Sequence, residues 1–126
     1  MDNSERSEEI VMLAAAASGC AEEERTLLKT LCAAAEQEVT ASLRAGVTPD
    51  ECAMVYVCAC AWMAAGALEL SRCGDGIAAM RAGDVSVTLR NDREREERCR
   101  KLREQASRIL APYTAGDAFF FRGVKG

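Results

Sequence analysis

The chain has 126 residues, which is enough for one domain with one modest hydrophobic core. It carries 16 Lys and Arg against 20 Asp and Glu, so its formal net charge is −4. That balance lacks the basic excess needed to neutralise a phosphate backbone and argues against nucleic-acid binding as the main activity. The chain has no His, so acid–base catalysis of the commonest kind near neutral pH is also disfavoured.

The seven cysteines follow neither a disulfide nor a metal-site pattern. Their number is odd, and we expect no signal peptide, which disfavours a secreted disulfide scaffold. Cys52, Cys58 and Cys60 lie within a helical pattern, and no Cys-x-x-Cys or Cys/His zinc spacing is present. We expect the thiols to be small buried apolar side chains in a reducing cytosol. A thiol-based redox or metal role is the alternative.

The N-terminal third of the chain predicts two helices. Residues 1–9 are polar, and we expect them to be extended or flexible, followed by a short apolar helix over residues 10–17. Three glutamates at 22–24 open a second helix, as suits the positive end of a helix dipole. Its apolar stripe recurs every three or four residues from Leu28 to Val39, and Gly46 is placed to end it.

A third helix begins at the clearest local signal in the chain. Thr48 can cap the helix, Pro49 suits its first position, and Glu51 completes a capping box. The run 52–68 carries no charge and is shorter than the roughly 20 apolar residues that span a bilayer. A helix without a polar face must be surrounded by protein, so we expect it at the centre of a bundle. Tyr56 and Trp62 are its largest side chains.

A short strand is predicted after the third helix. Apolar and polar residues alternate there, as in a half-buried strand: Gly83, Asp84, Val85, Ser86, Val87, Thr88 and Leu89. A single strand is not stable alone, so we expect it either to form a hairpin with residues 76–82 or to add to the sheet edge of another chain.

A fourth helix, capped by Asn91 or Asp92, is expected to follow and to end near residue 113. Its segment 93–98 has no apolar side, and the apolar stripe resumes only at Leu102. The charged segment fits a solvated face with ion pairs such as Glu94–Arg98 and Glu97–Lys101, or a strip where identical subunits interlock.

All three phenylalanines of the chain lie past this helix, at Phe119, Phe120 and Phe121, followed by Val124. A small domain normally keeps such large apolar side chains for its core. Their position near the chain end suggests that the tail docks onto another molecule. The alternative is that the phenylalanines fold back over their own bundle.

The order of these elements resembles that of a known family. The residues that carry the likeness are Leu27-Leu28, Ala33-Ala34-Ala35-Glu36, Cys58-Ala59-Cys60-Ala61-Trp62, Ala82-Gly83-Asp84-Val85-Ser86-Val87, Ala111-Pro112-Tyr113 and the Phe/Gly-Val end. From about Leu13 onward the chain resembles the head-tail connector (adaptor) proteins of long-tailed bacteriophages and of prophages in Gram-positive bacteria. Its charged segment 90–98 departs from what the family leads us to expect.

The resemblance implies a helical bundle without enzymatic activity, catalytic residues, cofactor or metal. It implies a ring of identical subunits beneath the portal protein that joins capsid to tail, together with other head-tail joining proteins. DNA would pass through without specific binding, and no membrane would be involved. The protein would reside at the head-tail interface of the virion, and in the cytoplasm of the bacterial host during assembly.

We therefore predict a single all-α domain over residues 1–126, a bundle of about four helices with a short β strand or hairpin between the third and fourth, and with 1–9 and 114–126 extended or flexible. By position, contacts with sister subunits or partners would be made by Val85, Ser86, Val87, Leu89, Phe119, Phe120, Phe121 and Val124. The rival hypotheses are a small cytosolic helical module that recognises a protein partner, and a thiol enzyme or metal protein.

Overall fold

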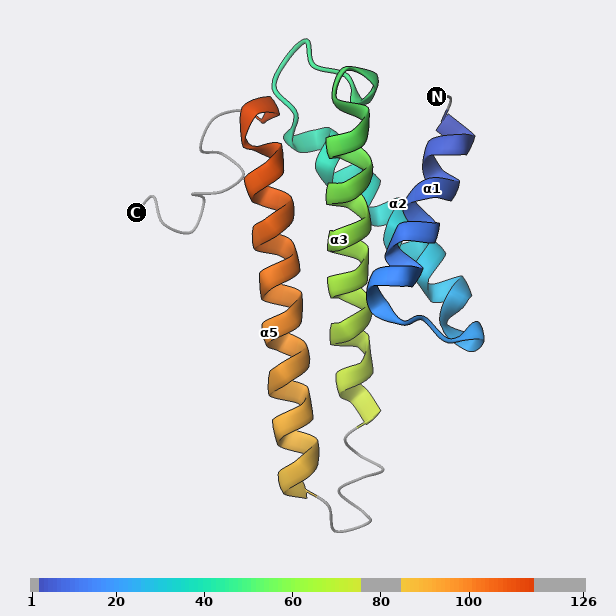
Figure 1. Ribbon diagram of the computed structural model, residues 1–126, viewed down its shortest axis with the longest axis vertical. Helices are drawn as coiled ribbons and strands as arrows, with labels where there is room; N and C mark the ends of the chain where they lie inside the picture. The colour runs from blue at the N-terminus through green and yellow to red at the C-terminus, as the bar shows by residue number, and fades with distance from the viewer. Residues whose placement is uncertain (1–2, 76–84, 115–126) are drawn as a thin grey trace.

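The computed structural model describes the backbone of residues 3–75 and 85–114, and the side chains of residues 3–73 and 92–114. The described chain is a bundle of α-helices with short 3-10 turns at several of their ends. The α-helices are α1 (Asn3–Ser18), α2 (Arg25–Ser42), α3 (Ala53–Ser71) and α5 (Val85–Leu110). In Figure 1, α3 stands in the middle, α5 runs alongside it on one side, and α1 and α2 lie on the other. The all-α bundle is thus confirmed.

The central position predicted for the third helix is also confirmed. α3 packs against α1, α2 and α5 and buries more of its residues than the other helices that the structure describes. Tyr56 is 2% exposed and belongs to the core, as expected. Trp62, the other large side chain of this helix, is half-buried at the edge of the core.

Close approach between α3 and α5 depends on Gly66. A Cβ atom built at this position would lie 3.2 Å from the Sγ atom and 3.3 Å from the Cα atom of Cys99 on α5. These distances are shorter than most real Cβ contacts, so the two backbones meet where α3 has no side chain. Small residues let helices pack at short range, and Cys99 fills the space as a buried apolar side chain.

The N-terminal residues form helix rather than an extended segment, because α1 begins at Asn3. The reason is Arg6, whose buried guanidinium donates to the Oδ1 atom of Asp50 at 2.7 Å and stacks 5.4 Å from the ring centre of Tyr56. It also donates to the side chain of Asn3. These contacts hold the first turn of α1 to the start of the third helical segment, so the expectation for residues 1–9 is wrong over 3–9.

The loop between α2 and α3 contains the predicted Gly46 and capping residues, but α2 ends before Gly46 and not at it. α2 ends at Ser42, and Gly46 lies in the loop with a φ of +88°, a left-handed conformation that favours glycine. The 3-10 helix η2 (Pro49–Cys52) then leads into α3. The carboxylate of Glu51 accepts from the backbone N–H of Thr48 at 3.4 Å, which is the Glu51 half of the predicted capping box, and from the Thr48 hydroxyl at 3.3 Å.

The strand predicted over residues 84–89 is wrong where the structure describes it, because α5 begins at Val85 and includes Ser86, Val87 and Leu89. An alternation of five residues is a weak signal, and a strand needs a partner to be stable. A helix that already exists downstream gains one backbone hydrogen bond for each residue added. Residues 76–84, where a hairpin partner was expected, lie outside the described residues.

The described chain contains no strand, only an isolated antiparallel bridge between Leu43 and Thr114. The backbone N–H of Arg44 donates to the carbonyl of Tyr113 at 3.0 Å, and its side chain donates to the carbonyl of Pro112. These bonds fix the end of the fourth helical segment beside the C-terminal end of α2. Thr114 is therefore ordered and buried, which corrects the expected start of the flexible tail at residue 114.

Candidate interaction surfaces

The predicted contact residues fall into two groups. Val85, Ser86, Val87 and Leu89 lie in the first two turns of α5, so they share a helix rather than a strand edge. The tail residues Phe119, Phe120, Phe121 and Val124 lie outside the described residues. The candidate surfaces that the structure does describe are an exposed stripe on α3 and a groove between α1 and α2.

One side of α3 is apolar but incompletely covered. We call it the α3 stripe, and it consists of Met54, Val55, Cys58 and Trp62, whose spacing places them on one face of the helix. Met54 is 71% exposed, and the other three are half-buried. α1, α2 and α5 cover the rest of the helix. Together the four side chains leave one apolar face of α3 only partly covered.

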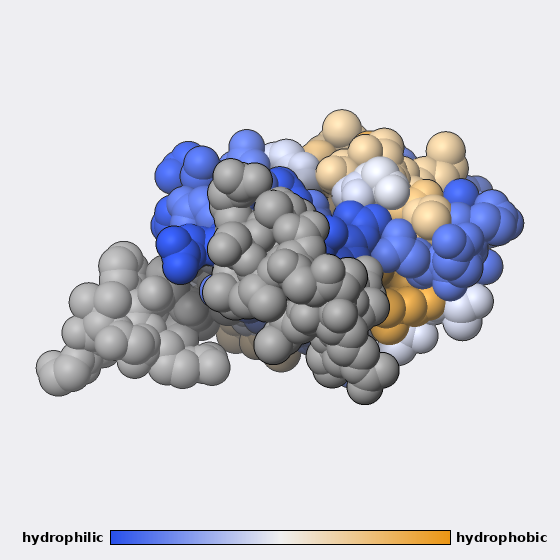
Figure 2. Space-filling view, turned by 90° about the horizontal axis from the view of Figure 1, so that it is seen from below, coloured by the Kyte–Doolittle hydropathy of each residue, from blue (hydrophilic) through white to orange (hydrophobic). Residues whose placement is uncertain are grey.

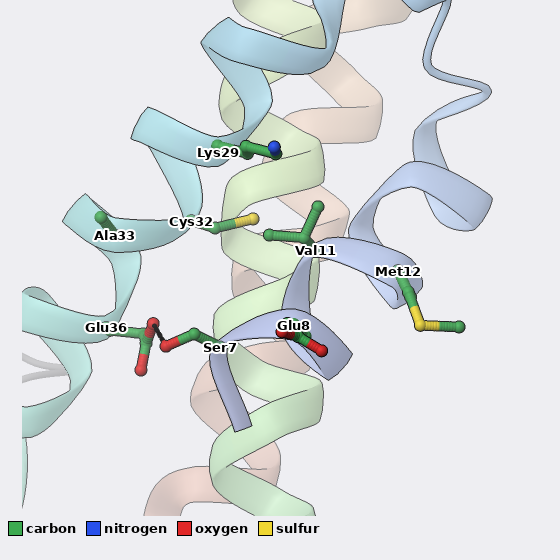
Figure 3. A pocket seen from close by; sticks show the side chains of 8 residues that line it. All are labelled: Ser7, Glu8, Val11, Met12, Lys29, Cys32, Ala33 and Glu36. Carbon is green, nitrogen blue, oxygen red and sulfur yellow. Dashed lines mark hydrogen bonds between the residues drawn. The ribbon is translucent and has the colours of Figure 1, made fainter. Parts of the chain in front are cut away.

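The second surface is an open groove between α1 and α2 with a volume of about 470 Å³. We call it the α1/α2 groove. Figure 3 shows its lining side chains, which come from both helices: Ser7, Glu8, Val11, Met12, Lys29, Cys32, Ala33 and Glu36. Viewed from below, apolar side chains are exposed on the right, where α1 and α2 lie, beside strongly hydrophilic surface (Figure 2). Val11 and Cys32 point toward one another across the groove, and Met12, which is 68% exposed, lies at its outer edge on α1 (Figure 3).

The polar end of the groove is held in place by hydrogen bonds. The hydroxyl of Ser7 donates to the Oε2 atom of Glu36 at 2.9 Å, the bond drawn in Figure 3. Behind it, the hydroxyl of Tyr56 lies 3.0 Å from that of Thr40 and 3.3 Å from the carbonyl oxygen of Glu36. Burial raises the pKa of Tyr56 to about 12, so its hydroxyl stays protonated. This network fixes the carboxylate of Glu36 at the groove.

An ion-pair cluster joins the lower ends of the helices. Arg72 donates to both carboxylate oxygens of Glu24, at 2.9 and 2.8 Å, and pairs with Glu69 at 3.3 Å. It also donates to the carbonyls of Ser18 and Gly19, at 2.9 and 3.3 Å, which caps the C-terminal end of α1. The pKa of Glu24 falls to about 2, mainly because of its hydrogen bonds with Arg72 and then with the Ala21 backbone. We call this group the Arg72 cluster.

The charged segment of α5 is tied to α3 through the same cluster. Arg98 pairs with Glu69 at 2.7 Å, and Arg95 donates to the carbonyl of Arg72 at 3.1 Å. Burial alone would raise the pKa of Glu69, but hydrogen bonds and charge from Arg98 and Arg72 lower it. Arg98 thus reaches across to α3, whereas the solvated interpretation expected it to pair with Glu94. Farther along the helix, Arg100 pairs with both Glu97 and Glu104 on the exposed side.

The cysteines are all free thiols. Four are buried, namely Cys32, Cys52, Cys60 and Cys99, and three are half-buried, namely Cys20, Cys58 and Cys73. Burial raises the pKa of Cys32 to about 11 and raises that of Cys60 further, which suppresses the reactive thiolate. Within the described residues, no group of three or more Cys, Asp or Glu side chains is placed to hold a metal ion.

The third helical segment is strongly apolar along its length. Pro49–Ser71 is long and apolar enough to cross a membrane by length and composition. Of its most apolar stretch of 18 residues, 61% is buried inside the protein. Burial by α1, α2 and α5 is the position that the sequence predicts for it.

No protein-family model, curated protein or solved structure matches the chain. Function must therefore be argued from the surfaces themselves. Sequence reasoning missed both the α3 stripe and the α1/α2 groove. The half-buried state of Trp62 depends on where α5 lies, and the groove depends on the distance between α1 and α2. Neither helix position is encoded in a short stretch of sequence.

Proposed function

We propose that this chain is a structural subunit of a homo-oligomeric ring that joins a phage or prophage capsid to its tail. The family resemblance provides the specific assignment, and the helical bundle is compatible with it. The observation that carries the proposal is the α3 stripe. A central helix that keeps Met54 71% exposed and Trp62 half-buried offers apolar surface that another protein surface can cover.

The charge pattern supports contact between copies. The outer side of α5 carries both signs close together, with Arg100 between Glu97 and Glu104. Alternating charge on an exposed helix favours a defined register between neighbouring subunits more than it favours tight binding. A mildly acidic ring also suits a DNA channel, since a net charge of −4 per subunit repels DNA weakly. In this proposal the partners are sister subunits, the portal protein and other head-tail joining proteins.

A second candidate function is a small module that recognises a helix or peptide of another protein. The α1/α2 groove favours it, because the groove is open, lies between two helices and has Val11 and Met12 in its lining. Helix-in-groove recognition uses such surfaces. The two candidates differ in the oligomeric state that they require, because a recognition module can act as a monomer.

The stripe can be tested with Met54→Glu in the full-length protein, with Gln37→Glu on the exposed side of α2 as control. Each variant adds one negative charge at an exposed position, so neither should unfold the bundle. Burying an unpaired carboxylate in an interface is costly, and we expect Met54→Glu to weaken self-association at least about tenfold. Sedimentation velocity over a concentration series measures the effect. Equal association of the two variants would remove the stripe as support for the ring.

A further inference from the structure

We infer that the α1/α2 groove is the receptor for the C-terminal tail of a second copy of this chain, residues 117–126. The inference rests on the proposed function and deepens it, because it names the surface that each subunit offers to its neighbour. The sequence predicts a contact role for the tail but gives it no receiving site. The α1/α2 groove lies wholly within the described residues and is lined in part by apolar side chains.

The chemistry of the groove matches that of the tail. Val11, Met12, Cys32 and Ala33 provide an apolar floor and wall, and the tail supplies three consecutive phenylalanines. A volume of about 470 Å³ is large enough for aromatic side chains to serve as anchors. Buried aromatic residues in a pocket contribute most of the affinity in many interfaces. No Phe elsewhere in the chain competes for this role.

The charges are also complementary. The groove carries two carboxylates, Glu8 and Glu36, and one ammonium group, Lys29, so its rim is net negative. The tail carries Arg122 and Lys125 against Asp117, so its side chains are net positive. Ser7 and the network behind it orient the carboxylate of Glu36. A basic residue that follows the aromatic anchors would meet a fixed negative charge at the polar end of the groove.

The route of the chain favours a second copy over the same subunit. Thr114 is paired with Leu43 at the C-terminal end of α2. Leu43 lies ten residues beyond Ala33, which is about 15 Å along the helix axis. The groove lies on the α1 side of α2, whereas Glu38 on another side of α2 pairs with Arg103 of α5. A tail in its own groove would have to travel this length and also pass around a helix about 10 Å wide.

The tail is short for that route. Phe119 is five residues beyond Thr114, which spans at most about 17 Å when fully extended. Glu36, at the near end of the groove, lies about 10 Å from Leu43 along the axis, so Phe119 reaches that end of its own groove but not the stretch around Ala33. A neighbouring subunit removes this constraint. Because tail and groove are different surfaces, the contact is heterologous, and repeated contacts of this kind close into a ring when the rotation allows.

A mixing experiment with two full-length variants tests the inference. The groove variant is Ala33→Glu, which introduces a carboxylate into the apolar floor next to Glu36, and its matched control is Ala34→Glu. Both positions are exposed and adjacent on α2, but only Ala33 lines the groove. The tail variant carries Phe119→Ser, Phe120→Ser and Phe121→Ser. Native mass spectrometry reports the oligomers formed by each protein alone and by the mixture, and circular dichroism checks that each is folded.

We expect Ala33→Glu and the tail variant each to associate at least about tenfold more weakly than the native chain, and Ala34→Glu to match the native chain. Mixed together, the two defective variants should form a one-to-one heterodimer, in which the intact tail of one fills the intact groove of the other. No larger assembly should form, because the complementary surfaces of the pair are both defective.

Each of the other outcomes counts against the inference in a distinct way. If the native chain forms rings and Ala33→Glu associates as well as Ala34→Glu, the groove is not the receptor, but the proposed ring stands. If both variants are defective and the mixture stays monomeric, tail and groove do not pair with each other. If the native chain is monomeric at all concentrations tested, the proposed ring fails and this inference fails with it.

Discussion

Replacing Arg72 with Met should destabilise the protein far more than an equivalent change on the surface of α5. Arg72 has 18% of its side chain exposed and binds Glu24, Glu69 and the carbonyls that end α1. Methionine keeps the apolar stem, so the loss reports on the guanidinium. Removing one member of a buried ion pair costs about 3–5 kcal/mol, and partial exposure reduces this here to about 2–3 kcal/mol.

The matched control is Arg100→Met. Arg100 also pairs with two carboxylates, Glu97 and Glu104, but its side chain is 55% exposed. Solvent screens pairs between groups as exposed as these, so they contribute little to stability. Urea unfolding followed by circular dichroism at pH 7 gives the free energy of unfolding for both variants. We expect Arg72→Met to lower this free energy by about 2–3 kcal/mol, and Arg100→Met to leave it almost unchanged.

The pH dependence of stability provides a second readout for the same variant. The pKa of Glu24 is about 2 in the folded chain against an ordinary 4.5, so its stabilising effect is full above pH 4.5 and is lost as the pH falls toward 2. The gap in stability between the native chain and Arg72→Met should therefore narrow below pH 4.5. Equal losses of stability by the two arginine variants at pH 7, or a gap that does not change with pH, would contradict a buried role for the Arg72 guanidinium.

Gly66→Ala should destabilise the bundle by about 1–3 kcal/mol despite the better helix propensity of alanine, because the new methyl group would push against Cys99. Thermal unfolding measures this loss of stability, and a stabilised variant would contradict the close approach of α3 and α5. A thiol reagent should modify Cys20, Cys58 and Cys73 in the native protein, and all seven cysteines only after unfolding. Mass mapping locates the modified residues, and rapid reaction of Cys60 would show that the core is open. Deleting residues 117–126 should leave the circular dichroism spectrum helical but weaken self-association, and normal assembly of the truncated chain in sedimentation runs would argue against a contact role for the tail.

The parts of the fold that the sequence predicts well are those with strong local signals. The capping box at Thr48 and the continuous apolar surface of the third helix lead directly to its start and its central position. The predicted strand failed because five alternating residues next to a helix carry little information, and backbone hydrogen bonds of the helix decided their conformation.

Long-range pairing explains the remaining differences. Arg6 looks like an ordinary polar residue, and its burial depends on Asp50 and Tyr56, which are more than 40 residues away in the sequence. Arg98 fits an ion pair within its own helix, yet it binds Glu69 of α3. The candidate surfaces have the same origin, because the exposure of Met54 and the width of the α1/α2 groove depend on where whole helices come to lie.

Negative-stain imaging of the purified full-length chain, over a rising protein concentration, tests the central claim most directly. We expect closed rings of identical subunits, which Met54→Glu and Ala33→Glu both disrupt and Gln37→Glu and Ala34→Glu leave intact. Particles that remain single bundles at every concentration, with Met54 still open to solvent labelling, would contradict it.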